Sequence, residues 1–212
     1  MKYSYLILFF LFPLAVFSQS KKNVVSVNYF NDLSVGNRIF KSTFPFFGEN
    51  ILVMNRDVYN FSIQVEYERK LNDNMNTFFS INYAQRNFKS EIILEGNLLQ
   101  FFNKALIQKL SFINYNFGLK KYFGKINVFQ FYGKAGFGIG KSCHKPNSFF
   151  MTTFEDKLYH VFFGFGMNRE IRNNLKWKVE ININHSLNPI IKEFKESKIQ
   201  VLSLGFGLKY EF

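Results

Sequence analysis

The last eleven residues of the chain alternate strictly between two kinds of side chain. Even positions from 202 to 212 hold leucine, phenylalanine or tyrosine, while the odd positions between them hold serine, glycine, lysine or glutamate. A period of two is typical of a β-strand that has one apolar and one polar face. The series ends on its apolar face, with Phe212 as the final residue. A closed barrel strand that meets lipid needs such a face, so the pattern favours a transmembrane β-barrel.

Seven further stretches of the chain show the same alternation. Their apolar series begin at Val25, Tyr59, Phe79, Ile113, Phe129, Tyr159 and Leu175. Together with the last stretch they predict eight strands, each about as long as a tilted strand must be to cross a membrane. The predicted fold class is therefore all-β: an eight-stranded antiparallel up-and-down transmembrane barrel.

The predicted connections between these strands alternate between long and short. They are 30–57, 69–76, 87–108, 121–127, 141–157, 169–174 and 186–198. Outer-membrane barrels have long external loops and short periplasmic turns, so both chain ends are expected on the periplasmic side. Aromatic residues near the strand ends are expected to form girdles at the water interfaces. On the periplasmic side these are Tyr67, Tyr122, Trp177 and Tyr210.

The first 18 residues have the parts of a secretory signal peptide. Lys2 precedes an apolar run over residues 5–17, and Val16 and Ser18 suit cleavage before Gln19. The run is shorter than the roughly 20 residues of a membrane-spanning helix. The predicted organisation is a signal peptide over 1–18 and a barrel domain over 19–212.

The charge and cysteine content limit the partners that this chain can have. Its formal net charge of +12 suits a surface that faces anionic lipid, including lipopolysaccharide phosphates. Nucleic acid is not expected as a partner, because the chain is exported and has no basic run. Cys143 is the single cysteine, so an internal disulfide and a cysteine-based metal cluster are both excluded.

A soluble eight-stranded barrel of the lipocalin kind is the rival fold, and it would place the apolar face inside. The polar face argues against it, because that face is rich in glycine. Small residues suit the crowded inner side of a narrow barrel and would cover a water-facing surface poorly. The glycines on this face are Gly118, Gly136, Gly138, Gly140, Gly164, Gly166, Gly205 and Gly207.

The predicted inward face also carries charges of both signs. An eight-stranded barrel has an interior that side chains just fill, so these charges are expected to form a paired, hydrogen-bonded plug. The alternative is a narrow path in which the same charges select ions. The predicted lumen charges are Glu66, Glu68, Arg86, Lys120, Lys134, Lys176, Lys178, Glu180, Lys209 and Glu211.

Neither a catalytic site nor a metal or cofactor site is predicted. The histidines His144, His160 and His185 have no spacing that suits a metal. His185 and Ser186 invite comparison with lipid A deacylases, which are eight-stranded barrels with a serine and a histidine near the outer rim. Adjacent residues of a strand point in opposite directions, however, so these two do not form a catalytic pair.

Two of the predicted external loops are unusually apolar. The second could continue as a hairpin over residues 91–110, turning at 95–97. One interpretation is that strands extend beyond the membrane and the loops pack on each other; the other is a contact site for a surface partner. The candidate contact residues are Phe44, Phe46, Phe47, Phe101 and Phe102.

These features together resemble the small outer-membrane barrel families of the OmpA and OmpX membrane-domain type. The resemblance covers almost all of the mature chain and includes its last strand, which is similar to the C-terminal signal recognised by the barrel-assembly machinery. The residues of that signal are Leu204, Phe206, Leu208, Tyr210 and Phe212. The chain has no peptidoglycan-binding domain after the barrel, so the wall-anchoring role of larger OmpA proteins is not implied.

We therefore expect a non-enzymatic, monomeric integral outer-membrane barrel with a structural or surface-interaction role. The alternatives are a narrow pore for ions or small solutes and a barrel subunit of an envelope secretion machine, with a lipid-modifying enzyme last. Expected partners are membrane lipid, lipopolysaccharide and the assembly machinery, followed by a surface or envelope-machine protein. No cofactor is expected.

Overall fold

The computed structural model describes most of the predicted barrel domain. The described residues are 23–34, 38–44, 48–54, 59–93, 106–126, 128–144, 154–190, 192 and 198–212. Several predictions fall outside them and stay predictions. These are the signal peptide over 1–18, the turn at 95–97, and the candidate contacts Phe46, Phe47, Phe101 and Phe102.

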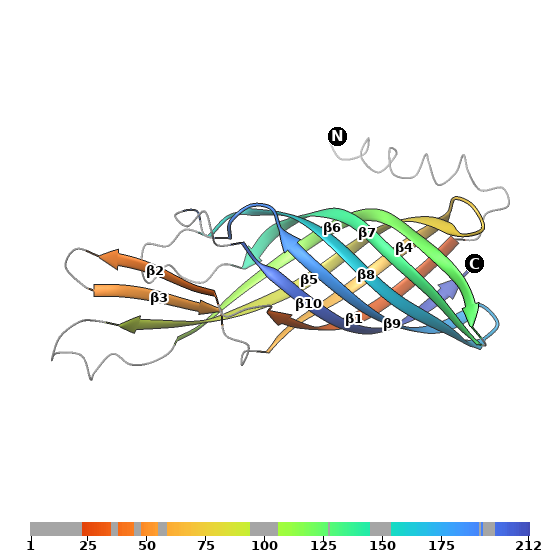
Figure 1. The fold of residues 1–212 in the computed structure, drawn as a ribbon, viewed down its shortest axis with the longest axis horizontal. Helices are drawn as coiled ribbons and strands as arrows, with labels where there is room; N and C mark the ends of the chain where they lie inside the picture. The colour runs from red at the N-terminus through yellow and green to blue at the C-terminus, as the bar shows by residue number, and fades with distance from the viewer. Residues whose placement is uncertain are drawn as a thin grey trace, which may run out of the picture.

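Eight strands form a closed, all-antiparallel barrel, which confirms the predicted fold class (Figure 1). Each strand pairs with the next one around the barrel, and β10 closes the ring on β1. The barrel strands are β1 (Asn23–Ser34), β4 (Asn60–Lys70), β5 (Met75–Ile93), β6 (Leu106–Ile126), β7 (Phe129–His144), β8 (Lys157–Arg172), β9 (Leu175–Ser186) and β10 (Gln200–Glu211).

Short turns join β4 to β5, β6 to β7 and β8 to β9 at one end of the barrel, called here the turn end. Asn23 and Phe212 exchange backbone hydrogen bonds there, at 3.0 and 2.9 Å. Gly124 and Asn174 have positive φ angles of 107° and 68°, which glycine and asparagine tolerate best. In the exposed first turn, Lys70 donates to Asp73 at 2.6 Å and lowers the pKa of that carboxyl group.

A hairpin extends the sheet beyond the opposite end of the barrel, called here the loop end (Figure 1). Its strands are β2 (Arg38–Phe44) and β3 (Gly48–Met54), and β3 pairs with the end of β5 through Glu49–Val53. The pairing of β5 with β6 continues out to Ser90 and Leu106, so both strands extend into the second predicted loop. The first predicted loop, 30–57, therefore contains two strands, and strands do continue past the barrel.

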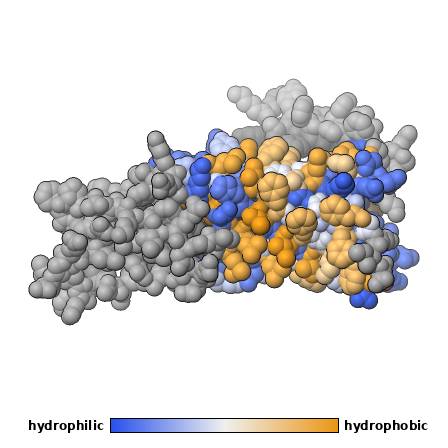
Figure 2. Space-filling model, viewed as in Figure 1, coloured by the Kyte–Doolittle hydropathy of each residue, from blue (hydrophilic) through white to orange (hydrophobic). Residues whose placement is uncertain are grey.

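The outer face of the barrel is apolar. Every barrel strand has large, apolar, exposed residues at alternate positions, with Phe163 60% and Phe165 69% exposed on β8. Figure 2 shows the resulting apolar band, with polar residues at either side of it. The C-terminal series lies on the same face of β10, with Leu204, Phe206, Leu208, Tyr210 and Phe212 all about half exposed. Among the described residues, no helix is long and apolar enough to cross a membrane.

The glycines of the polar face lie inside the barrel, and some of them face aromatic side chains. A Cβ atom on Gly205 would collide with the ring of Phe30, and one on Gly166 would collide with the ring of Tyr132. These glycines therefore make room for aromatic side chains in a narrow interior. An apolar outside and a polar inside exclude the lipocalin arrangement.

Candidate functional site: a charged layer and a pocket inside the barrel

Seven buried charged side chains meet across the barrel interior towards the turn end and form what we call the charged layer. They come from β4, β6, β7, β9 and β10, and their side chains are at most 2% exposed. Each points inward because it shares the parity of the polar face of its strand. The members are Glu66, Glu68, Lys120, Lys134, Lys178, Glu180 and Lys209.

Glu66 is at the centre of the charged layer and contacts three lysines. Its Oε1 accepts hydrogen bonds from the Nζ atoms of Lys120 at 2.6 Å and Lys178 at 3.1 Å. Its Oε2 lies 3.5 Å from Lys134 Nζ. Three ammonium groups therefore surround one fully buried carboxylate, an arrangement that compensates for the loss of its hydration.

The other two carboxylates of the layer are each bound by lysines and by a tyrosine. Glu68 contacts Lys120 at 2.5 Å and accepts a hydrogen bond from Tyr122 at 2.7 Å. Glu180 pairs with Lys134 and accepts a hydrogen bond from Tyr132 at 2.6 Å.

The lysines are bound in turn by carboxylates and aromatic rings. Lys209 donates to the Tyr122 hydroxyl at 2.7 Å, and Lys120 lies over the Tyr132 ring at 4.7 Å from its centre. These contacts cross the lumen in several directions, so the layer fills it.

Two polar residues of the barrel interior were not predicted there from the sequence. Tyr122 was predicted in the periplasmic girdle, and this was wrong: the residue is buried in the lumen, where its hydroxyl binds Glu68. Its parity with Lys120 on the same strand is the signal that would have placed it inside. Asp32 was missed because the first predicted strand stopped too early, whereas β1 continues to Ser34.

Three predicted lumen charges lie outside the charged layer, in two other ion pairs. Arg86 Nη1 donates to Asp32 Oδ2 at 2.6 Å, nearer the loop end. Lys176 and Glu211 pair at 2.7 Å at the turn end, where both side chains are partly exposed. Of the ten predicted residues, seven therefore form the buried layer, two pair with each other at the turn end, and Arg86 pairs with Asp32, which was not predicted.

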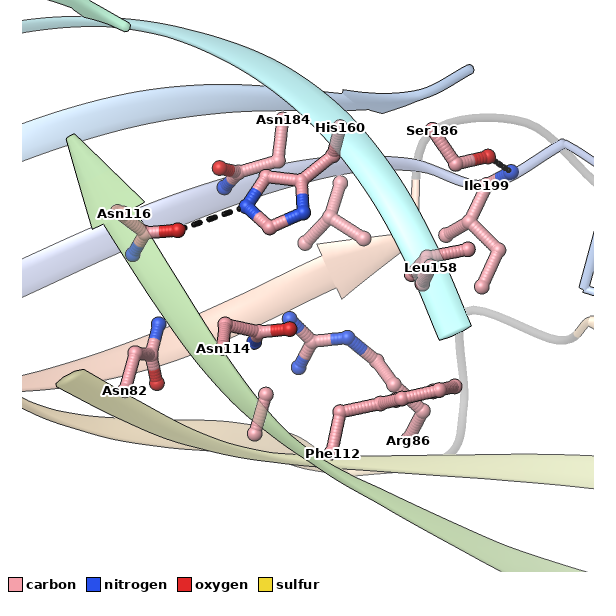
Figure 3. Close-up of a pocket in the computed structure, with 12 residues that line it drawn as sticks. Asn82, Arg86, Phe112, Asn114, Asn116, Leu158, His160, Asn184, Ser186 and Ile199 are labelled. Atoms are coloured by element: carbon pink, nitrogen blue, oxygen red, sulfur yellow. Dashed lines mark hydrogen bonds between the residues drawn. The ribbon is translucent and has the colours of Figure 1, made fainter. Parts of the chain in front are cut away.

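A pocket of about 50 Å³ lies between the charged layer and the loop end and is called here the outer pocket (Figure 3). Polar side chains form part of its wall: Asn82, Arg86, Asn114, Asn116, His160, Asn184 and Ser186. Apolar side chains form the rest: Ala84, Phe112, Leu158, Ile199 and Val201. Leu110, Phe154 and Ile190 extend the apolar part of this wall into a buried cluster.

The polar wall of the outer pocket has free acceptors. His160 Nε2 bonds to Asn116 Oδ1 at 2.8 Å, and Arg86 is occupied by Asp32. Asn82 Oδ1 and Asn114 Oδ1 have no hydrogen-bond partner within the described part of the chain. A smaller cavity of about 20 Å³ shares Asn82, Asn116 and Asn184 with this pocket and reaches Lys134 of the charged layer. The space inside the barrel is therefore polar on the loop-end side, and the charged layer fills it towards the turn end.

The structure brings a serine and a histidine to the outer pocket, but not the adjacent pair considered in the sequence. Ser186 lies opposite His160 in the pairing of β8 with β9, whereas His185 lies opposite Val161. Ser186 Oγ accepts a hydrogen bond from the Ile199 amide at 2.6 Å. His160 is directed towards Asn116 instead, as Figure 3 shows. Neither His160 nor His185 is hydrogen-bonded to Ser186 among the described contacts, so the geometry does not support a nucleophile–base pair.

Metal-binding groups do not cluster in the described part of the chain. No three His, Cys, Asp or Glu side chains there are placed to hold a metal ion together. Cys143 is exposed and free. The chemistry that the described interior offers is thus ion pairing and hydrogen bonding.

The comparisons with known proteins match at the level of fold. No family model matches the chain, and no curated protein sequence matches it. OprG of Pseudomonas aeruginosa aligns with a TM-score of 0.54 at 10% identity, over 91% of this chain and 95% of that one. Neisserial surface protein A aligns with a TM-score of 0.52 at 11% identity, over 91% of this chain and 97% of that one. Ail, the attachment invasion locus protein of Yersinia pestis, aligns with a TM-score of 0.50 at 14% identity, over 92% of this chain and 100% of that one. The chain has the fold of the small eight-stranded outer-membrane barrels.

Proposed function

We propose that this chain is an integral outer-membrane protein that holds a protruding β-sheet at the cell surface for contact with a partner protein. In this proposal the barrel is a filled, non-enzymatic base. The turn end faces the periplasm and the loop end faces the exterior. The partner contributes an extended segment that adds to the edge of the sheet.

The outer face of the barrel supports the membrane location. Its apolar residues are exposed around the whole barrel, whereas soluble monomers seldom expose apolar patches larger than a few hundred Å². Ring closure pairs the backbone groups of neighbouring strands, as a segment in hydrocarbon requires. The fold shared with outer-membrane proteins supports the same location.

The filled lumen argues against the pore alternative. A conduction path would have to displace the ion pairs that join Glu66 to three lysines, and breaking buried pairs is costly. The lipid-modifying alternative lacks a serine–histidine contact in the outer pocket. No described feature favours the secretion-machine alternative over a surface contact.

One observation carries the proposal: β2 is an edge strand outside the barrel. The order of the sheet begins at β2, which pairs with β3 and, within the described residues, with no other strand. The free side of such a strand presents unpaired backbone N–H and C=O groups. An extended peptide can add there as a further strand, with main-chain hydrogen bonds supplying affinity.

The proposal predicts that a photo-crosslinking amino acid at Ser42 will form a covalent adduct with a protein at the surface of intact cells. Ser42 lies within β2, opposite Asn50 of β3, so a strand added to β2 would pass within reach of it. Immunoblots of irradiated cells would show the adduct as a band of higher mass.

The control is the same amino acid at Lys192, an exposed position at the loop end but outside the protruding sheet. An adduct from Ser42 and none from Lys192 would support strand addition at β2. Equal adducts from both positions, or none from Ser42 in cells that carry the folded barrel, would contradict it.

A further inference from the structure

Two lysines face each other on the outer surface of the barrel near the loop end. Lys141 of β7 and Lys157 of β8 are direct partners in the antiparallel pairing, and both are exposed. They continue the outward-facing series of their strands, one step beyond Ile139 and Tyr159, which also oppose each other. The Cβ atoms of directly opposed residues on antiparallel strands lie about 5 Å apart, so both ammonium groups can reach the same group of a ligand.

Lys141 and Lys157 place two like charges side by side on the outer face of the described barrel. Like charges directly opposite each other on a sheet repel and destabilise it. The buried lysines of the charged layer all have carboxylate partners, and the rim residues Lys70 and Lys176 pair with Asp73 and Glu211. Neither Lys141 nor Lys157 has an ion pair in the described structure. An anion bound between them would remove the repulsion.

The depth of the two lysines indicates which anion this is. Tyr159 and Tyr115 are exposed on the same outer face, and each lies directly opposite Ile139 of β7. Tyrosines of this kind mark the level where the apolar part of a membrane meets its headgroups. The lysines are one outward-facing position further out, which is the level of lipid phosphates.

We propose that Lys141 and Lys157 form a binding site for the phosphate group of an outer-leaflet lipid. Each ammonium group would donate a charge-assisted hydrogen bond to the phosphate oxygens. The site rests on the membrane location stated above, and it adds a specific lipid contact on the face formed by β7 and β8.

The test measures binding of diphosphorylated lipid A to the purified full-length protein in detergent micelles by native mass spectrometry. A lysine near an anionic lipid surface contributes roughly 1 kcal/mol, which corresponds to about a five-fold change in affinity. Lys141→Gln and Lys157→Gln should each weaken binding about five-fold, and the double variant about twenty-five-fold. Lipid A without its phosphate groups should bind the wild-type protein and the double variant with the same affinity.

Lys121→Gln is the matched control, because Lys121 is exposed and faces outward near the turn end, opposite Gly133 and Met75. It should bind lipid A as wild type does. Equal weakening by Lys121→Gln, or no weakening in the double variant, would overturn the site. Competition by equimolar inorganic phosphate would overturn the assignment to a lipid.

Folding of each variant is checked by the heat dependence of its electrophoretic mobility. A wild-type chain that never enters micelles as a folded barrel would contradict the membrane location. A folded barrel whose lipid binding ignores both lysines would contradict only the phosphate site.

Discussion

Replacing Glu66 with glutamine is expected to lower the free energy of unfolding of the barrel by about 3–5 kcal/mol. The substitution keeps the shape of the side chain but removes the negative charge that Lys120, Lys134 and Lys178 surround. Four lysines of the charged layer would then share two carboxylates in a buried site. Urea unfolding of the protein in lipid vesicles, followed by the fluorescence of Trp177, would measure the loss.

Asp73→Asn is the control for this prediction. It also removes a carboxylate from a lysine contact of 2.6 Å, but the Asp73 side chain is 94% exposed. Exposed pairs contribute about 1 kcal/mol or less, so this variant should remain close to wild type. Equal stability of the two variants would mean that the charged layer does not hold the strands together.

Replacing Phe163 with arginine is expected to lower the free energy of unfolding in lipid vesicles by about 2–4 kcal/mol. Phe163 is 60% exposed on the outer face of β8, between Ala135 of β7 and Ile183 of β9. Lipid surrounds this position in our account, and a charge in the middle of the hydrocarbon is poorly solvated. The same vesicle unfolding experiment would measure the loss.

Leu187→Arg is the matched control, because Leu187 is 50% exposed just beyond β9 at the loop end. A charge near the interface costs about 0–1 kcal/mol. If Phe163→Arg unfolded no more easily than Leu187→Arg, the outer face of the barrel at Phe163 would be in contact with water.

The barrel strands could be predicted from the sequence because lipid imposes a strict period of two on them. The period fades where a strand leaves the lipid, and the errors occur there. Asn31 is exposed on the outward face of β1, so the apolar series that begins at Val25 ends two residues earlier, although the strand continues to Ser34. The β2–β3 hairpin was predicted only as a loop for the same reason, since strands beyond the membrane have no lipid-facing side.

The direction of the lumen charges could also be predicted, but their partners could not. Parity places Glu66 and Lys178 inside, yet they are 112 residues apart in the chain. Their contact depends on how the strands are staggered when the barrel closes, and no single strand contains that information. The same stagger separates Arg86 from the charged layer and brings it to Asp32.

The electrophoretic mobility of the outer-membrane fraction, heated and unheated, tests the central claim most directly. A closed barrel in that membrane resists unfolding by detergent until it is heated. The account therefore predicts that this protein is in the outer-membrane fraction and that its band changes mobility on heating. A protein recovered from the soluble periplasmic fraction, with the same mobility before and after heating, would contradict it.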